Sequence, residues 1–175
     1  MPTPLAISVK QPWAWLILRP DLTDPAARAA ARAAGHIKDR ENRDWASGQR
    51  GWVLLHASAS KFAKWDWAAA ALFAAKRGVD IPLQGTMPFG AYVGAIRIDG
   101  CHAYAQGSRW FVGPNAFTIG ASVPFVRPVV GPGTLNFFQV PPPGSGAGGD
   151  QLMRDLAREI REAGLAAEFG LTKIL

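Results

Sequence analysis

Cysteine and histidine are scarce in this sequence, with one and three residues. Cys101 is its single cysteine, so no disulfide can form within the chain and zinc sites built on cysteines are excluded. The three histidines lie far apart in the sequence, which argues against a metal site. We therefore expect neither a metal ion nor a cofactor.

Long apolar runs are absent as well. No stretch approaches the about 20 apolar residues that span a bilayer. The opening Met-Pro-Thr-Pro lacks the basic-then-apolar layout of a signal peptide. Together with the near absence of cysteine, these features predict a cytoplasmic protein that has no membrane partner.

Acidic side chains are outnumbered, with 13 Asp and Glu against 19 Lys and Arg and a net charge of +6. Such an excess favours polyanionic partners through phosphate neutralisation, and solubility alone is the other interpretation. The basic residues of the first third favour a basic face there: Arg19, Arg28, Arg32, Lys38, Arg40, Arg43, Arg50, Lys61 and Lys64.

A length of 175 residues suits one domain with a sizeable core. Apolar alternation predicts strands at residues 5–9, 37–45, 52–57, 91–98, 110–112, 116–119, 122–126 and 135–140. The segments 37–45 and 52–57 are expected to form a hairpin. Frequent Gly and Pro breaks favour a small β-barrel over an open parallel sheet. We expect an α+β fold with its main domain at 1–140, a linker at 141–149 and a C-terminal helical extension at 150–175.

Four helices are predicted beside these strands, and the first begins at Pro12 and ends before Pro20. The second, at residues 25–34, is capped by Asp24 and consists almost entirely of Ala and Arg. Its Arg28 and Arg32 share a face. That face either contacts phosphates or is simply solvated, and the solvated interpretation is slightly favoured.

The third predicted helix runs from Ser58 or Ser60 to Arg77. Its buried stripe is predicted to comprise Phe62, Trp65, Ala69, Leu72 and Phe73. The last helix starts at a capping Asp150, and its apolar stripe comprises Leu152, Met153, Leu156, Ile160 and Leu165. This stripe either docks on the chain's own barrel, which we favour, or binds a partner chain.

The segment from Lys38 to Arg43 packs five ionised side chains into six residues. Strand geometry places Glu41 and Arg43 on one face, and Lys38 points the other way. For Lys38 to share a pocket with Glu41, the chain must turn or bulge between them. A neutral Lys38 would act as a base and a charged one would bind phosphate. The alternative is a surface strand with weak ion pairs.

Three motifs of the chain are similar to those of the ASCH domain, a branch of the PUA-like β-barrel superfamily. They are residues 7–14 (Ile-Ser-Val-Lys-Gln-Pro-Trp-Ala), the signature Gly-x-Lys-x-x-Glu-x-Arg met by Lys38, Glu41 and Arg43, and residues 50–58. The signature glycine is replaced by His36. The resemblance covers roughly residues 5–140 and implies a small PUA-like barrel with flanking helices.

The resemblance implies RNA binding or nucleoside handling in a pocket beside Lys38, Glu41 and Arg43. Some family members are amidohydrolases that remove the acyl group from N4-acetylcytidine, and their signature Lys activates a Thr at the position of Glu41. This chain lacks that nucleophile. We therefore expect a module that binds RNA or a modified nucleoside. The alternative is a metal-independent ribonuclease or, less favoured, an amidohydrolase in which Lys38 and Glu41 are catalytic.

Further residues are expected to contact the ligand. Lys10 would bound the pocket, and Gln11 would read a base edge. Trp13 and Trp110 would stack on a base, although each is more often a core residue.

Two residues at the end of the segment 52–58 are also candidates. His56 would perform acid–base chemistry near neutral pH, or it is a core histidine with satisfied hydrogen bonds. Ser58 would contact the ligand or cap the following helix, and the cap is favoured.

Overall fold

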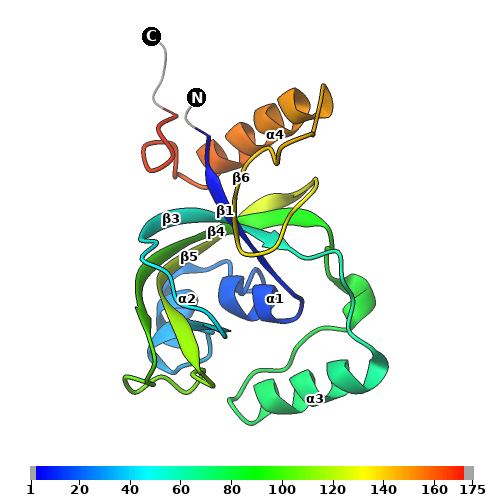
Figure 1. The fold of residues 1–175 in the computed structure, drawn as a ribbon. Coiled ribbons are helices and arrows are strands. Elements are labelled where there is room, and N and C mark those ends of the chain that lie inside the picture. The colour runs from blue at the N-terminus through cyan, green and yellow to red at the C-terminus, as the bar shows by residue number, and fades with distance from the viewer. Residues whose placement is uncertain (1–2, 172–175) are drawn as a thin grey trace.

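A computed structural model describes residues 3–171 of the chain as a mixed α+β fold. Within these residues, six strands form one sheet that curls into a half-barrel, and four α-helices lie around it (Figure 1). The curled sheet agrees with the barrel-like α+β fold that the sequence predicts. No helix in this part of the chain combines the length and the apolar character needed to cross a membrane.

The sheet has the strand order β2-β5-β4-β3-β1-β6. All neighbouring strands are antiparallel except β1 and β3, which are parallel. The strands are β1 (Leu5–Val9), β2 (Arg40–Arg43), β3 (Gly51–Ala57), β4 (Ala91–His102), β5 (Asn115–Val130) and β6 (Phe137–Gln139).

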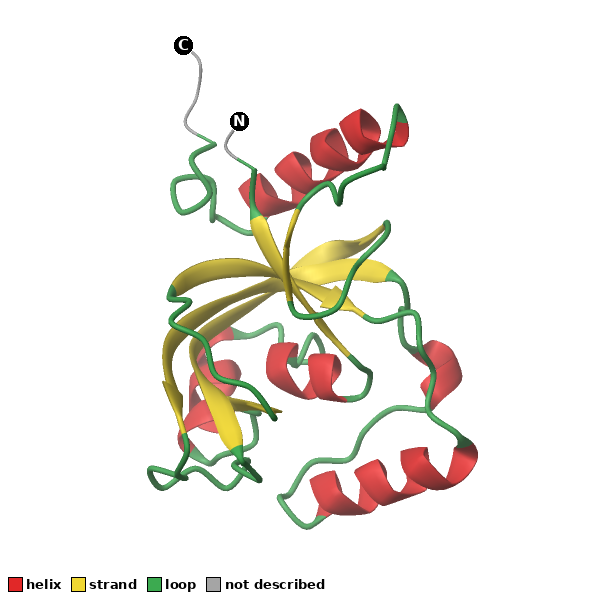
Figure 2. Ribbon diagram, viewed as in Figure 1, coloured by secondary structure: helices red, strands yellow, loops and turns green. Residues whose placement is uncertain are grey.

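Helices lie on both faces of the sheet (Figure 2), and the buried apolar side chains of the sheet and these helices form two main clusters. Helix α1 (Trp13–Leu18) lies inside the curl, where Ile17 and Leu18 pack with Ile7 and Val9 of β1. Helix α4 (Gly148–Glu162) covers the other face. Because successive side chains of a strand alternate between faces, β1 contributes Ile7 and Val9 to the first cluster and Ala6 to the second.

The expected hairpin between residues 37–45 and 52–57 is wrong. Strand β2 pairs with β5, and β3 lies between β1 and β4. The burial of the two segments explains this arrangement. The apolar β3 is buried from Val53 to Ala57 and occupies the sheet interior, while the charged β2 takes an edge position.

Two predicted strands, 116–119 and 122–126, are one continuous strand, β5. The segment 110–112 is not a strand. Gly120 does not interrupt β5, and Gly94 of β4 lies where an added Cβ would collide with the Val123 carbonyl oxygen. Close approach of β4 and β5 at their glycines thus supports the curvature that the sequence predicts.

Helix α2 (Pro25–Ala33) begins as predicted, since the Asp24 carboxylate accepts a hydrogen bond from the Ala27 amide at 2.8 Å. The slightly favoured interpretation of its arginines, a solvated face, is wrong. Arg28 donates to the carbonyl and the hydroxyl of Ser122 at 2.8 Å each. Arg32 donates to the Ile119 carbonyl at 3.3 Å. The helix therefore docks on β5 through its guanidinium groups.

Helix α3 (Lys64–Ala75) begins later than predicted and turns a different face inward. Ala70 and Ala74 are its buried residues, whereas Trp65 is 80% exposed and Leu72 is 57% exposed. Small side chains let the helix approach the body of the protein closely. The predicted buried stripe is therefore wrong for Trp65, Ala69 and Leu72, which are exposed, and Trp67, expected off the stripe, is half-buried.

Helix α4 buries its apolar stripe on the sheet, where Leu152, Leu156 and Ile160 pack against Tyr92 and other residues of β4 and β5. This is the favoured arrangement of the two that the sequence left open. The helix starts at Gly148, inside the expected linker, and Asp150 lies in its first turn without a capping bond. Residues 172–175 of the predicted C-terminal extension lie outside the described residues.

Candidate functional site

A cavity of about 500 Å³ lies between α1, β2 and α3. Lys38 and Glu41 contribute to one side of it, and Trp13, Phe62 and Phe73 contribute aromatic surface. Within the charged stretch, the residues that line the cavity are thus Lys38, Glu41 and Asn42.

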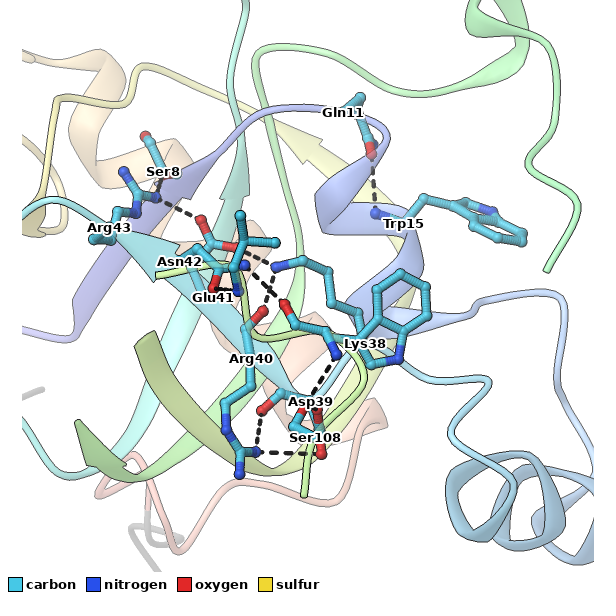
Figure 3. A network of polar contacts seen from close by, with 12 residues as sticks. Ser8, Gln11, Trp15, Lys38, Asp39, Arg40, Glu41, Asn42, Arg43 and Ser108 are labelled. Atoms are coloured by element: carbon cyan, nitrogen blue, oxygen red, sulfur yellow. Dashed lines mark hydrogen bonds and ion pairs between the residues drawn. The ribbon is translucent and has the colours of Figure 1, made fainter. Parts of the chain in front are cut away.

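Lys38 reaches Glu41 because the chain turns before β2 begins. The Lys38 amide donates to the Leu16 carbonyl at 2.9 Å, which holds this residue against α1 rather than in the strand. Its Nζ then donates to the Arg40 carbonyl and to Glu41 Oε2, the latter at 2.7 Å (Figure 3). Lys38 is 3% exposed and Glu41 is 6% exposed. The geometric condition for a shared pocket is met.

Arg43 completes this cluster from the other side. Its Nη2 lies 3.1 Å from Glu41 Oε1 and donates to the Ser8 carbonyl at 2.6 Å (Figure 3). The Glu41 carboxylate thus lies between two cations. The Nη2 of Arg43 is thus engaged by β1 and by Glu41, while its Nε is buried without a hydrogen-bond partner in the described residues.

The Lys38–Glu41 pair retains capacity for a ligand. A Lys ammonium has three N–H donors, and Lys38 uses two of them on Arg40 and Glu41 within the described residues. Each oxygen of the Glu41 carboxylate keeps a second lone pair. One side of the cavity therefore offers a donor beside an acceptor, with the charges of Lys38 and Glu41 in balance.

Asn42 shapes the cavity but has most of its amide engaged. Its Oδ1 accepts from the amides of Val112 and Gly113 at 2.8 and 3.3 Å. Its Nδ2 donates to the Trp110 carbonyl at 2.9 Å. These bonds fix the segment that brings Val112 to the cavity wall.

Aromatic rings supply flat surface on the α3 side. Trp13 meets Phe73 and Phe62 edge to face, with centroid distances of 5.6 and 6.4 Å. Asp66 and Ala69 of α3 also border the cavity and are exposed at their outer side. This combination of flat apolar walls and a polar end suits a planar ring with a hydrogen-bonding edge.

Two other predicted ligand contacts, Lys10 and Gln11, have different positions. Lys10 lies at the rim, with its Nζ 5.8 Å from the centroid of Phe62. Gln11 is buried and bridges two segments, since its Oε1 accepts from the Trp15 amide at 3.0 Å and its Nε2 donates to the Pro88 carbonyl at 3.1 Å. It does not read a ligand edge in this arrangement.

Trp110 is a core residue rather than a stacking platform. It is 1% exposed, and its indole Nε1 donates to the Gly35 carbonyl at 2.9 Å. It packs in a small cluster with Leu16 and Ala74. Trp13 is therefore the one of the two predicted tryptophans that borders the cavity.

His56 and Ser58 border a different cavity, of about 400 Å³, beside the loop 131–135. Burial lowers the pKa of His56, and a hydrogen bond to the Gly131 carbonyl opposes this shift. Ser58 Oγ accepts from the Ser60 amide at 3.2 Å. Since α3 begins at Lys64, the favoured helix-cap role of Ser58 is wrong.

The expected basic face in the first third of the chain is largely absorbed by the fold. Arg19 pairs with Asp21 at 2.8 Å, and Arg28 and Arg32 bond to β5. The exposed cations near the cavity are lysines instead: Lys10 at its rim, and Lys61 and Lys64 before and at the start of α3.

Sequence reasoning missed Phe62, Phe73 and Asp66 as cavity residues. Phe62 and Phe73 have helical spacing and were expected in a buried helix stripe. The available signal was Asp66, because its acidic side chain shares that face with Phe62 and Phe73 at spacings of four and seven residues.

In residues 3–171, no three His, Cys, Asp or Glu side chains are grouped so that they could hold a metal ion. Compared with known proteins, the chain matches no protein-family model and no curated protein.

Proposed function

We propose that this chain is a PUA-like ASCH module that binds RNA or a modified nucleoside in the cavity beside Lys38 and Glu41. The observation that carries the proposal is the cavity itself: aromatic walls from Trp13, Phe62 and Phe73 meet a buried Lys–Glu pair. The order of the sequence motifs and the curled sheet support the family assignment. The cytoplasm remains the expected compartment, on the basis of the single cysteine.

A nucleobase matches both parts of this cavity. Its flat face suits aromatic side chains, and stacking on them contributes about 1–3 kcal/mol per base. Its edge carries donors and acceptors side by side, which proteins read in unpaired bases. The remaining N–H of Lys38 would donate to a ring nitrogen or carbonyl, and Glu41 would accept from an exocyclic amino group.

The surroundings of the cavity favour a nucleobase that is part of a single-stranded nucleic acid over a free nucleoside. Trp65 of α3 is 80% exposed, and Lys64 Nζ lies 6.0 Å from the centroid of its ring. Lys10 lies over Phe62 at the rim. Exposed aromatic rings beside cations are the elements that bind flanking bases and phosphates of single strands.

A substitution that fills the cavity tests whether RNA binds there. Ala69 is exposed on α3 and borders the cavity, so Ala69→Phe blocks the space without disturbing the buried face of the helix. Ala75 is exposed on the same helix and lies outside the cavity, so Ala75→Phe is the matched control. Binding of a fluorescently labelled single-stranded RNA would be measured by anisotropy, with cytidine and N4-acetylcytidine as competitors.

We expect Ala69→Phe to weaken RNA binding at least about tenfold, the equivalent of one stacked base. Ala75→Phe should bind like the unmodified protein, and binding should weaken steeply as salt rises. Absence of RNA and nucleoside binding at low salt, or equal binding by the two variants, would refute the proposal.

Hydrolysis at the same cavity is the second candidate function. Its support is the 2.7 Å contact of Lys38 Nζ with Glu41 Oε2, which places an acid and a base side by side at the ligand position. It predicts cleavage of RNA, or release of acetate from N4-acetylcytidine, that is lost in Lys38→Ala. Glu41 remains paired with Arg43 in this variant. Turnover by the folded variant would exclude this role of Lys38.

A further inference from the structure

The second cavity, of about 400 Å³, lies apart from the first. Ser8 lines it together with His56 and the loop 131–135. Since Ala6 packs on the face that carries α4, the alternation of β1 directs Ser8 to that same face. The cavity beside Lys38 belongs to the side that carries α1 and α3.

Ser8 and His56 meet because β1 and β3 are parallel and place these two residues in register. Ser8 Oγ lies 3.0 Å from His56 Nδ1. On the other side of the ring, His56 Nε2 lies 3.0 Å from the Gly131 carbonyl oxygen. Gly133 permits the loop to close over this ring, because a Cβ there would collide with Nδ1.

These contacts define the protonation of the ring. A carbonyl oxygen only accepts hydrogen bonds, so Nε2 carries the proton and donates to Gly131. In a neutral imidazole Nδ1 is then the acceptor, and the Ser8 hydroxyl donates to it. Burial lowers the pKa of His56, which favours this neutral form near pH 7.

We propose that Ser8 and His56 form a second, hydrolytic site that acts on small esters through an acyl-serine intermediate. A serine hydroxyl is a weak nucleophile until an adjacent base takes its proton, and a third group must orient that base. Ser8, His56 and the Gly131 carbonyl occupy these three positions in order. The carbonyl orients the imidazole as a carboxylate does in serine hydrolases.

The reaction balances with water as the only co-reactant. Ser8 Oγ attacks the ester carbonyl carbon while its proton passes to His56 Nδ1. The bond to the alcohol oxygen breaks, and the alcohol leaves with that proton. Water then attacks the acyl group and gives its proton to Nδ1, after which the carboxylic acid departs and Ser8 regains its hydrogen.

The cavity, of about 400 Å³, has room for the acyl group of a small ester. It is bordered by the side chains of Ser58, Ser60 and Thr134, and by Leu135, which is 85% exposed. Within residues 3–171, the Thr134 and Leu135 amides donate to no protein acceptor. The Ala59 and Gly133 amides of this cavity also donate to no protein acceptor in that range, while the Gly131 amide is bonded to the Gly90 carbonyl, so the oxyanion would take its backbone donors from these four amides.

A fluorophosphonate probe tests the nucleophile directly, because it modifies only an activated serine. Full-length protein would be labelled, and the modified residue located by mass spectrometry. Hydrolysis of p-nitrophenyl acetate would be followed in parallel. The variants are Ser8→Ala, His56→Gln and the matched control Ser60→Ala, an exposed serine of the same cavity.

We expect one label per chain, on Ser8, and an initial burst of one p-nitrophenolate per chain. Both should disappear in Ser8→Ala and fall at least about a hundredfold in His56→Gln, the lower range for general-base catalysis. Ser60→Ala should keep both. Absence of labelling in the folded protein, or labelling that persists in Ser8→Ala, would overturn the proposal. RNA binding should be unchanged in Ser8→Ala, which separates this site from the proposed nucleobase cavity.

Discussion

Two polar clusters meet at strand β1 and satisfy their buried groups in opposite ways. In the first cluster, the Glu41 carboxylate forms salt bridges with both Lys38 and Arg43. Ser8 and His56 form a neutral chain that ends on a backbone carbonyl. Ser8 connects the two clusters. Its hydroxyl bonds to His56 in the neutral cluster, and its backbone carbonyl accepts a hydrogen bond from Arg43 of the charged cluster.

The comparison indicates how each cluster responds to damage. Removal of one member of a buried ion pair leaves a charge without a partner, which costs about 3–5 kcal/mol. Removal of one member of a neutral hydrogen bond leaves a polar group unsatisfied, which costs about 1–3 kcal/mol. Loss of one member of the charged cluster should therefore destabilise the fold more than loss of one member of the neutral cluster.

Glu41→Ala should have the largest effect on stability. It removes the anion between Lys38 and Arg43 and should lower the free energy of unfolding by about 3–5 kcal/mol. Urea denaturation would measure the change. The control is Asp99→Ala, which breaks the exposed pair with Arg97 (side chains 42% and 44% exposed) and should cost about 1 kcal/mol or less. Equal losses in both variants would contradict the assigned charge compensation.

Gly133→Ala should have the second-largest effect on stability, and it perturbs the neutral cluster of Ser8 and His56. The added methyl would collide with His56 Nδ1, so the ring or the loop must move. Overpacking of this kind costs about 1–3 kcal/mol. Gly85→Ala is the control, because nothing lies within 4 Å of its added Cβ. Thermal unfolding of the two variants would decide, and an unchanged midpoint in Gly133→Ala would show that the loop does not hold the ring.

The charged cluster was more accessible to sequence reasoning than the neutral one. Lys38, Glu41 and Arg43 lie within six residues. Strand geometry alone therefore shows that the chain must turn or bulge between Lys38 and Glu41 for their side chains to meet. Ser8 and His56 are 48 residues apart. They meet because β1 and β3 pair in parallel, and a pairing partner is a property of the whole sheet. For the same reason the hairpin between residues 37–45 and 52–57 was wrong.

Side-chain composition was informative for helix boundaries and misleading for helix faces. Pro25 and the Asp24 cap define the start of α2 locally. Its Ala and Arg residues are typical of a solvated helix, yet Arg28 and Arg32 dock it on β5, because a long side chain can carry its donors to distant carbonyls. In α3, Trp65 is exposed because small residues face the protein instead.

The pH dependence of stability should be a smaller effect. The folded pKa of His56 lies below the unfolded value of 6.5, so the unfolded state binds the proton first as the pH falls. The free energy of unfolding should be fully retained above pH 6.5 and decline toward the lower folded pKa. One proton contributes a slope of at most about 1.4 kcal/mol per pH unit.

Urea denaturation between pH 5 and 8 would measure this slope, and His56→Gln should flatten it. Tyr92 packs against the ring with centroids 4.9 Å apart, and it stays neutral because burial raises its phenol pKa. His36→Gln is the control, because within the described residues the His36 ring forms no salt bridge with a carboxylate. An equal slope in His56→Gln and the unmodified protein would show that His56 is not the linked group.

The smallest predicted quantity is the coupling between the two clusters. Arg43 donates to the backbone carbonyl of Ser8, and the substitution Ser8→Ala preserves this carbonyl. The bond to His56 is made by the Ser8 hydroxyl, and the same substitution removes it. In a double-mutant cycle of Ser8→Ala and Arg43→Ala, the effects on the free energy of unfolding should therefore add to within about 0.5 kcal/mol. A coupling above about 1 kcal/mol would mean that β1 shifts with either change, and that the charged and neutral clusters respond as one unit.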